Sequence, residues 1–112
     1  MIPVSNMRER ILITRQQVRT DALGNHKNVQ VPYCRRWAYA NRVSGGEEES
    51  GHVIREEESL YFVIRFDSET CHITSTGFQI EFRGKTYDIT SVDNYKFRNE
   101  SLTLYVKEKH HD

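Results

Sequence analysis

The stretch from Gly84 to Glu108, GKTYDITSVDNYKFRNESLTLYVKE, decides the fold of this chain. In its first half, Tyr87 and Ile89 fall on one face of an extended segment, and polar residues alternate with them. A polar reversal follows, and the second half places large apolar residues at every other position, namely Leu102, Leu104 and Val106. Alternation with a period of two is typical of a half-buried antiparallel strand. The stretch therefore predicts a β-hairpin against which the other strands pack.

Three further segments carry strand patterns. Residues 60–66 (LYFVIRF) are the most apolar and predict a central strand with one face formed by Leu60, Phe62, Ile64 and Phe66. Residues 78–82 (FQIEF) alternate as well, and a tight turn at Arg83-Gly84 joins them to the hairpin described above. Residues 8–15 (RERILITR) give the first strand of the chain.

A turn is predicted at residues 21–25 (DALGN). The carboxylate of Asp21 can bond the backbone ahead of it, and Gly24 tolerates a positive φ. The flanks, residues 16–20 and 28–31, are polar and could extend a long hairpin around this turn.

Pro32 and Trp37 follow this turn, and the chemistry of each predicts where it lies in the sheet. Pro32 is predicted at a strand end or a sheet edge, because proline cannot donate a hydrogen bond to a β-ladder. Trp37 shares a strand face with Tyr39, and as the only tryptophan it is predicted to be a core anchor. An exposed role in binding a partner is the alternative for Trp37.

These patterns together predict one domain, residues 1–112, with a mainly β fold. About six strands, one long flexible loop and little helix describe a small antiparallel β-barrel or a rolled sheet. Closure is favoured because it removes the exposed strand edges that invite aggregation. The 112 residues suit a single domain, and 37% hydrophobic against 29% charged residues indicate a small core and a well-solvated surface.

The long loop is residues 44–58, SGGEEESGHVIREEE. It holds three glycines, six glutamates and only two large apolar residues. Loops of this length are usually functional or disordered. The glutamate triplets at 47–49 and 56–58 lack the alternating oxygen ligands of a calcium loop, and they would repel a phosphate backbone.

Charge and cysteine content narrow the classes of function. Lys and Arg number 16, as do Asp and Glu, and the resulting net charge of zero argues against a general nucleic-acid binder. Cys34 and Cys71 lie far apart, lack a CxxC partner and are expected to be reduced thiols. No apolar run approaches the ~20 residues that span a bilayer, and the first residues lack a signal-peptide pattern. We therefore expect a soluble intracellular protein without membrane contact.

The sequence does not indicate catalytic or metal chemistry. It contains no nucleophile elbow and no phosphate-cradling glycine loop, and His26, His52 and His72 fit no metal-ligand spacing. The terminal pair His110-His111 could hold a metal ion weakly, but we expect a solvated tail. The protein is therefore expected to be non-enzymatic, with no catalytic residue, cofactor or metal site.

Six short motifs follow one another along the chain. They are Met7–Ile11 (MRERI), the turn Asp21–Asn25, Trp37-Ala38, Ser44-Gly45 with the glutamates after it, Gly84–Ile89 (GKTYDI) and Leu102–Leu104 (LTL). In their order and spacing these motifs resemble the phage head–tail adaptor family, also called head-closure or stopper proteins. The resemblance covers nearly the whole chain.

The resemblance implies a structural protein of the virion neck, assembled in the host cytoplasm. Such proteins form a ring of copies of themselves below the portal and its adaptor. The ring closes the DNA channel after packaging, docks tail-completion or tail-tube proteins, and meets the packaged DNA without sequence specificity. The long loop would project toward the channel, where its negative charge keeps DNA from adhering. The residues assigned to this channel loop are Ser44, Gly45, Gly46, Glu47, Glu48, Glu49, Gly51, His52, Val53, Ile54, Glu56, Glu57 and Glu58.

Contacts between subunits of a ring join two different surfaces. The candidates are outward aromatic and basic side chains: Arg35, Arg36, Tyr61, Tyr95, Phe97 and Tyr105. Ordinary cross-strand packing explains each of them equally well.

Two other functions stay open. One is a small β-barrel that binds single-stranded nucleic acid by stacking bases on tyrosines next to Arg or Lys, namely Tyr39 with Arg42, Tyr61 with Arg65 and Tyr95 with Lys96. The other is a tail-completion protein of the same particle.

Overall fold

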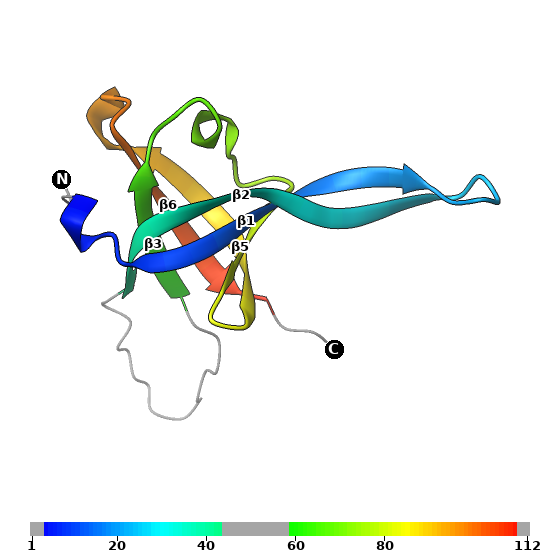
Figure 1. The fold of residues 1–112 in the computed structure, drawn as a ribbon, viewed down its shortest axis with the longest axis horizontal. Helices are drawn as coiled ribbons and strands as arrows, with labels where there is room; N and C mark the ends of the chain where they lie inside the picture. The colour runs from blue at the N-terminus through cyan, green and yellow to red at the C-terminus, as the bar shows by residue number, and fades with distance from the viewer. Residues whose placement is uncertain (1–3, 44–58, 110–112) are drawn as a thin grey trace, which may run out of the picture.

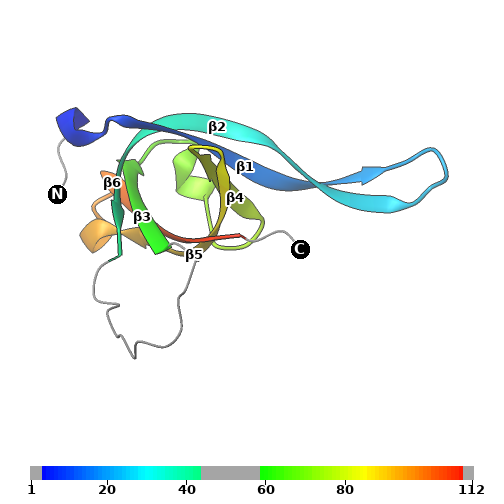
Figure 2. The same cartoon turned by 90° about the horizontal axis from the view of Figure 1, so that it is seen from below.

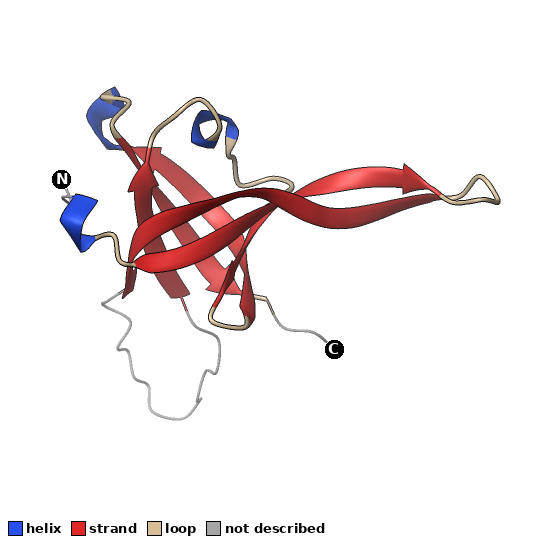
Figure 3. Cartoon of the chain, in the orientation of Figure 1, coloured by secondary structure: helices blue, strands red, loops and turns tan. Residues whose placement is uncertain are grey.

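The computed structural model describes residues 4–43 and 59–109, which form six β-strands and three short 3₁₀-helices. The strands are β1 (Glu9–Thr20), β2 (His26–Arg42), β3 (Ser59–Arg65), β4 (Phe78–Phe82), β5 (Lys85–Asn94) and β6 (Ser101–Glu108). The 3₁₀-helices are η1 (Val4–Asn6), η2 (Thr70–His72) and η3 (Tyr95–Phe97). For this part of the chain, the prediction of a mainly β fold with little helix is confirmed (Figure 3).

The six strands pair antiparallel and close into a barrel in the order β1-β2-β3-β6-β5-β4. Figure 2 shows the strands encircling the barrel interior. The barrel closes where residues 12–15 of β1 pair with residues 78–81 of β4. Because a closed sheet gives each strand a neighbour on both sides, few edges are left open. Of the two architectures predicted, the protein has the barrel.

The hairpin of residues 84–108 forms as predicted. β5 and β6 lie side by side, and the alternating apolar residues of both strands point into the barrel. The two-residue turn before β5 has φ values of 53° at Arg83 and 81° at Gly84. Positive φ at both central residues characterises the type I′ turn, whose twist matches that of the flanking strands.

Phe62 of β3 lies at the centre of the core and is fully buried. Its ring centroid is 5.0 Å from that of Phe82 and 6.3 Å from that of Tyr87, both in edge-to-face geometry. Such aromatic pairs contribute about 0.5–1.5 kcal/mol beyond the burial of their area. The strand predicted at residues 60–66 is confirmed as β3, and its inward side chains Leu60, Phe62 and Ile64 are buried.

The β1–β2 hairpin extends well beyond the barrel as an arm, residues 17–29 (Figure 1). At its tip the Asp21 Oδ1 atom accepts hydrogen bonds from the backbone N–H groups of Leu23 and Asn25, each at 2.9 Å. The hydrogen bond from the Asn25 backbone is the main influence on the carboxyl group, and the pKa of Asp21 is lowered. The predicted turn and the extension of the hairpin on both sides of it are confirmed.

Pro32 was predicted at a strand end or a sheet edge, and it lies inside β2, at an edge. It stands opposite Thr14, where the β1–β2 register shifts. The edge position is confirmed, because β2 pairs with β3 only from Tyr39 to Arg42, and among the described residues β1 is the only strand that pairs with β2 at Pro32. A bulge beside an open edge is a place where a strand accommodates a missing N–H.

The prediction of Trp37 as a core anchor is wrong, because its side chain is 55% exposed on the outside of the barrel. The inward position next to it belongs to Ala38, which is fully buried. Large residues of the facing strands, such as Phe62 and Ile11, already fill the interior. The wall at β2 therefore takes small inward side chains, and the bulky ring points outward.

Candidate functional site

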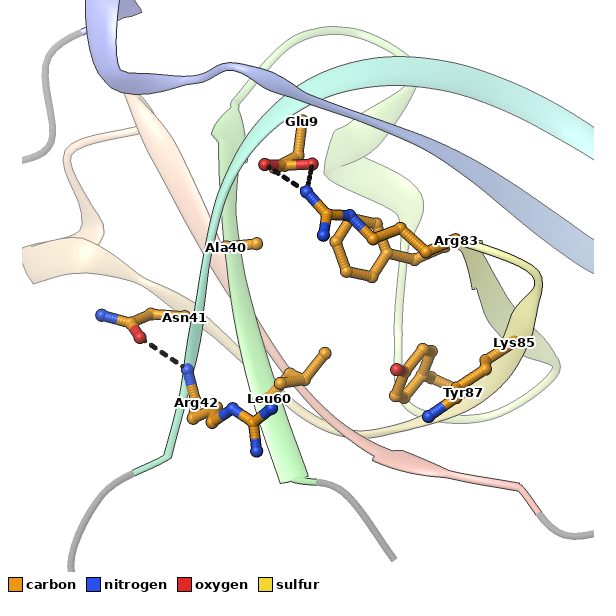
Figure 4. Close-up of a pocket in the computed structure, with 9 residues that line it drawn as sticks. Glu9, Ala40, Asn41, Arg42, Leu60, Arg83, Lys85 and Tyr87 are labelled. Atoms are coloured by element: carbon orange, nitrogen blue, oxygen red, sulfur yellow. Dashed lines mark hydrogen bonds and ion pairs between the residues drawn. The ribbon is translucent and has the colours of Figure 1, made fainter.

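One end of the barrel opens into a cavity of about 380 Å³ (Figure 4). Apolar surface is supplied from three strands by Leu60, Phe82 and Tyr87. The other lining residues are small, polar or charged: Glu9, Ala40, Asn41, Arg42, Arg83 and Lys85. The lining thus offers an apolar wall, three cations and one carboxylate, which are groups suited to non-covalent contact.

Two ion pairs hold the mouth of this cavity. The Arg83 Nη2 atom lies 3.0 and 3.1 Å from the two carboxylate oxygens of Glu9, so the β4–β5 turn is tied to the start of β1. The Lys85 Nζ atom lies 3.9 Å from the carboxylate of Glu108. Exposed pairs of this kind contribute at most about 1 kcal/mol. Their main effect is to position the turn and the strand ends around the cavity.

The chain segment between β2 and β3 leaves and returns at this same end. The backbone N–H of Val43 donates to the carbonyl of Ser59 at 3.0 Å, so the last residue before the segment lies against the first residue after it. Arg42, the last residue of β2, and Leu60, the second residue of β3, both line the cavity. The predicted channel loop, Ser44–Glu58, lies outside the described residues and stays a prediction.

Three tyrosines form a row across the outside of the barrel, here called the tyrosine row: Tyr39 on β2, Tyr61 on β3 and Tyr105 on β6. The ring centroids are 6.1 Å apart between Tyr39 and Tyr61, and 6.0 Å apart between Tyr61 and Tyr105. Burial, reinforced by the contact with the Tyr39 hydroxyl, raises the pKa of Tyr61. The outward Val63 beside them is only 5% exposed. Two of the six predicted contact residues, Tyr61 and Tyr105, are therefore brought together.

Trp37 extends this outer surface along β2. The guanidinium carbon of Arg10 lies 5.1 Å from the Trp37 ring centroid, a cation–π distance. Arg35 lines a groove on the same outer wall together with Arg10 and Glu81. The predicted contact residue Arg35 is thus exposed beside Trp37.

Arg36 points to the opposite side of the strand from Arg35 and is engaged within the chain. Its Nε atom lies 3.1 Å from Asp67 Oδ2, and its Nη2 atom lies 2.6 Å from Glu69 Oε1. These hydrogen bonds raise the pKa of Arg36. Burial alone would raise the pKa of Asp67, but hydrogen bonds from Arg36 and from the Thr70 and Glu69 backbone outweigh it and lower the pKa to about 2. The contact assigned to Arg36 stays a prediction, although its guanidinium already holds the β3–η2 connection.

The remaining two predicted contact residues, Tyr95 and Phe97, lie in η3, between β5 and β6. Phe97 is 88% exposed. In Figure 1 this turn is found at the end of the barrel opposite to the β4–β5 turn. The predicted contact residues are therefore distributed over the outer wall and the far end of the barrel.

The arm is the feature that the sequence patterns located but did not assign to any contact. Leu23 at its tip is 86% exposed, and Val18 along its length is exposed as well. The signal in the sequence was a large apolar residue, Leu23, in a turn whose other residues are small or polar. Such a residue has no packing role within a two-stranded hairpin.

Membrane-spanning helices and metal-binding clusters were sought in the described parts of the chain. No helix in them is both long enough and apolar enough to cross a bilayer. Within residues 4–43 and 59–109, no three His, Cys, Asp or Glu side chains gather in a way that would hold a metal ion.

The fold and these surfaces define a small β-barrel protein with aromatic and basic side chains displayed on the outside of a closed sheet. A family model described as phage head completion protein matches residues 2–109. The chain therefore belongs to the phage head completion protein family. It is a structural component of the phage virion that serves the joining of head and tail and contacts other proteins of the particle. The resemblance found in the sequence motifs is confirmed.

Solved structures share the fold. The solution structure of protein SF1141 from Shigella flexneri 2a is 19% identical, with 99% of this chain and 100% of that chain covered and a TM-score of 0.71. A chain in the virion of the native gene transfer agent particle is 16% identical, with 91% and 94% covered and a TM-score of 0.62. The comparison with curated proteins gave no match.

Proposed function

We propose that the protein forms a ring of identical subunits in the neck of the phage particle, below the portal and its adaptor. The ring closes the DNA channel after packaging and docks tail-completion or tail-tube proteins. Its subunits assemble in the host cytoplasm. The observation that carries the ring is the arm, residues 17–29, which stands clear of the barrel and is exposed along nearly all of its length (Figure 1).

An arm of this kind supports contact with a second copy of the chain. An isolated two-stranded hairpin is marginally stable in water, so an external surface that covers it adds to its stability. A ring joins two different surfaces of the same subunit. The arm supplies one, with Leu23 and Val18 as its exposed apolar residues. The tyrosine row and Trp37 supply a second, rich in the residue types that concentrate at protein interfaces.

Closure of the channel is supported by the place where residues 44–58 join the barrel. Both ends of this segment meet at the cavity end, since the Val43 N–H donates to the Ser59 carbonyl. The segment carries six glutamates, and like charges at short range repel more strongly where water is scarce. A negative segment turned toward the channel would stop DNA without adhering to it.

The substitution Leu23→Asp tests the ring. Burying a leucine side chain contributes about 1.5–3 kcal/mol, so a charge at this position should weaken association by about ten- to a hundredfold. Sedimentation velocity of the purified protein over a range of concentrations measures this, and images of the neck in assembled particles show the arrangement. The matched control is Phe97→Asp, which changes an equally exposed apolar residue away from the arm. A neck image without a ring of this chain would overturn the proposal.

Deletion of residues 45–57 tests channel closure. It leaves Ser44 and Glu58 as a two-residue connection between the hydrogen-bonded Val43 and Ser59, which is the length of a tight hairpin loop. The variant should fold with an unchanged circular dichroism spectrum, form rings and yield heads that lose their DNA. Full retention of DNA by these heads would remove the channel role while leaving the ring intact.

The tyrosine row also supports the nucleic-acid alternative, since successive rings could stack bases. Of the pairs considered, Tyr39 and Arg42 lie on opposite faces of β2, because Tyr39 is in the outer row and Arg42 lines the cavity. Salt-dependent binding of an oligonucleotide that is lost in Tyr61→Ala would favour this reading. The other alternative is a tail-completion protein of the same particle. It would occupy a different layer of the neck, and an image of the assembled neck would show which layer this chain occupies.

A further inference from the structure

The β5–β6 turn combines backbone strain with an exposed aromatic side chain. Lys96, Phe97 and Asn99 have φ values of 51°, 55° and 59°. Asparagine adopts this left-handed region readily, whereas lysine and phenylalanine do so at a cost. Glycine at either position would relieve the strain. Backbone strain that persists outside a structural need often marks a functional contact.

The turn is held firmly enough to present one side chain. Asn94 Nδ2 donates to Asn99 Oδ1 at 2.8 Å, and the Asn99 N–H donates to Asn94 Oδ1 at 3.1 Å. The N–H of Phe66 donates to the carbonyl of Glu100 at 3.0 Å, which anchors the end of the turn to the chain after β3. Phe97 itself is 88% exposed, so it contributes little to the core. The turn is therefore fixed at its base while Phe97 projects into solvent.

We propose that Phe97 is the anchor by which this end of the barrel docks onto a different protein of the phage particle, in an apolar socket edged by carboxylates. The choice of a particle protein as partner rests on the proposed function. The acidic edge follows from the two residues that flank Phe97 in the sequence, Lys96 and Arg98, which are both cationic. A central aromatic anchor with charged residues at the rim is a common arrangement of binding hot spots.

The test is complementation in vitro. DNA-filled heads and free tails, both from phage lacking this gene, are mixed with the purified protein, and bound protein and infectious titre are measured. Phe97→Asp should reduce head binding or tail joining by about tenfold or more, while its melting temperature and its sedimentation stay those of the wild type. Phe97→Leu, which keeps an apolar side chain, should restore most of the activity.

Two further variants separate docking from structure. Phe97→Gly relieves the φ strain, so the melting temperature of this variant should be equal to or higher than that of the wild type, while docking is lost. If Phe97 served the fold instead, the variant would melt at a lower temperature and would still dock. Lys96→Glu with Arg98→Glu should weaken docking and reduce its dependence on salt, whereas Lys109→Glu at the other end should not.

The outcomes are decisive in both directions. A Phe97→Asp protein that complements as well as the wild type overturns the inference. So does one that loses thermal stability or self-association, because Phe97 would then serve the fold or contacts between copies. A failure of the ring itself would be seen separately, as wild-type behaviour of Leu23→Asp in sedimentation and in neck images.

Discussion

The substitution Asp67→Asn gives a direct test of how the end of β3 is held. Asp67 Oδ1 accepts the backbone N–H groups of Glu69 at 2.8 Å and Thr70 at 2.9 Å, and Oδ2 lies 3.1 Å from Arg36 Nε. Asparagine keeps an oxygen acceptor for the backbone, but it places an NH2 group where Oδ2 accepts from Arg36, so the negative charge and this hydrogen bond are lost together. The change in stability therefore reports the whole interaction with Arg36, its hydrogen bond and its charge together.

The size of the effect follows from the pKa of Asp67, which is lowered from 3.8 to about 2. At about 1.4 kcal/mol per pH unit, this lowering corresponds to at most about 2.5 kcal/mol. The side chain is 38% exposed, and solvent screening reduces the contribution of such a pair. We expect Asp67→Asn to cost about 1–1.5 kcal/mol at pH 7. For a domain of this size that is a drop in melting temperature of about 4–12 °C.

The pH dependence has a definite sign. Because the pKa is lower in the folded protein, the stabilisation is complete above about pH 5 and is lost as the pH falls toward 2. Urea unfolding of wild type and variant at pH 7, 4, 3 and 2 measures the difference, which should shrink to roughly a sixth at pH 2. Asp93→Asn, the same change at an exposed position of β5, should stay within about 0.5 kcal/mol throughout. A difference between wild type and Asp67→Asn that does not change with pH would refute the reasoning.

Three other substitutions probe the barrel. Phe62→Ala should cost about 3–5 kcal/mol in urea unfolding, because it empties the centre of the core between Phe82 and Tyr87. Trp37→Ala should cost less than about 1 kcal/mol in urea unfolding, since the ring is exposed. For the same reason, acrylamide should readily quench the fluorescence of this single tryptophan in the wild type. Gly84→Ala should cost about 1–2 kcal/mol in thermal unfolding through its φ of 81° alone, because no atom lies within 4 Å of the added methyl group.

The strands were predictable because their side-chain pattern is set locally. Alternation at residues 60–66 and 101–108 separates an inward from an outward face without any knowledge of the neighbours. The same rule placed Trp37 and Tyr39 on one face but could not say which face meets the core. That choice depends on the space left by residues of other strands, which Ala38 fits and Trp37 does not.

The parts of the candidate site that escaped prediction depend on long-range pairing. Arg36 was grouped with Arg35 as a basic pair, yet its partners Asp67 and Glu69 lie more than 30 residues ahead in the chain. Tyr61 meets Tyr105 because β3 pairs directly with β6, and the intervening strands β4 and β5 lie elsewhere in the barrel. No local pattern encodes such a neighbour relation.

The arm carries a feature that local stability does not explain. Arg19 and Lys27 stand directly opposite each other in the β1–β2 register, and like charges in that position destabilise a hairpin. The open edges of the arm would also favour pairing with another arm, which such charges discourage. Both points fit an arm selected for contact with the wall of a neighbouring subunit. Arg19→Glu creates an opposite-charge pair with Lys27, so hydrogen exchange of the arm should slow. Sedimentation should nevertheless show weaker association, and stronger association would mean that the charges serve something other than the ring.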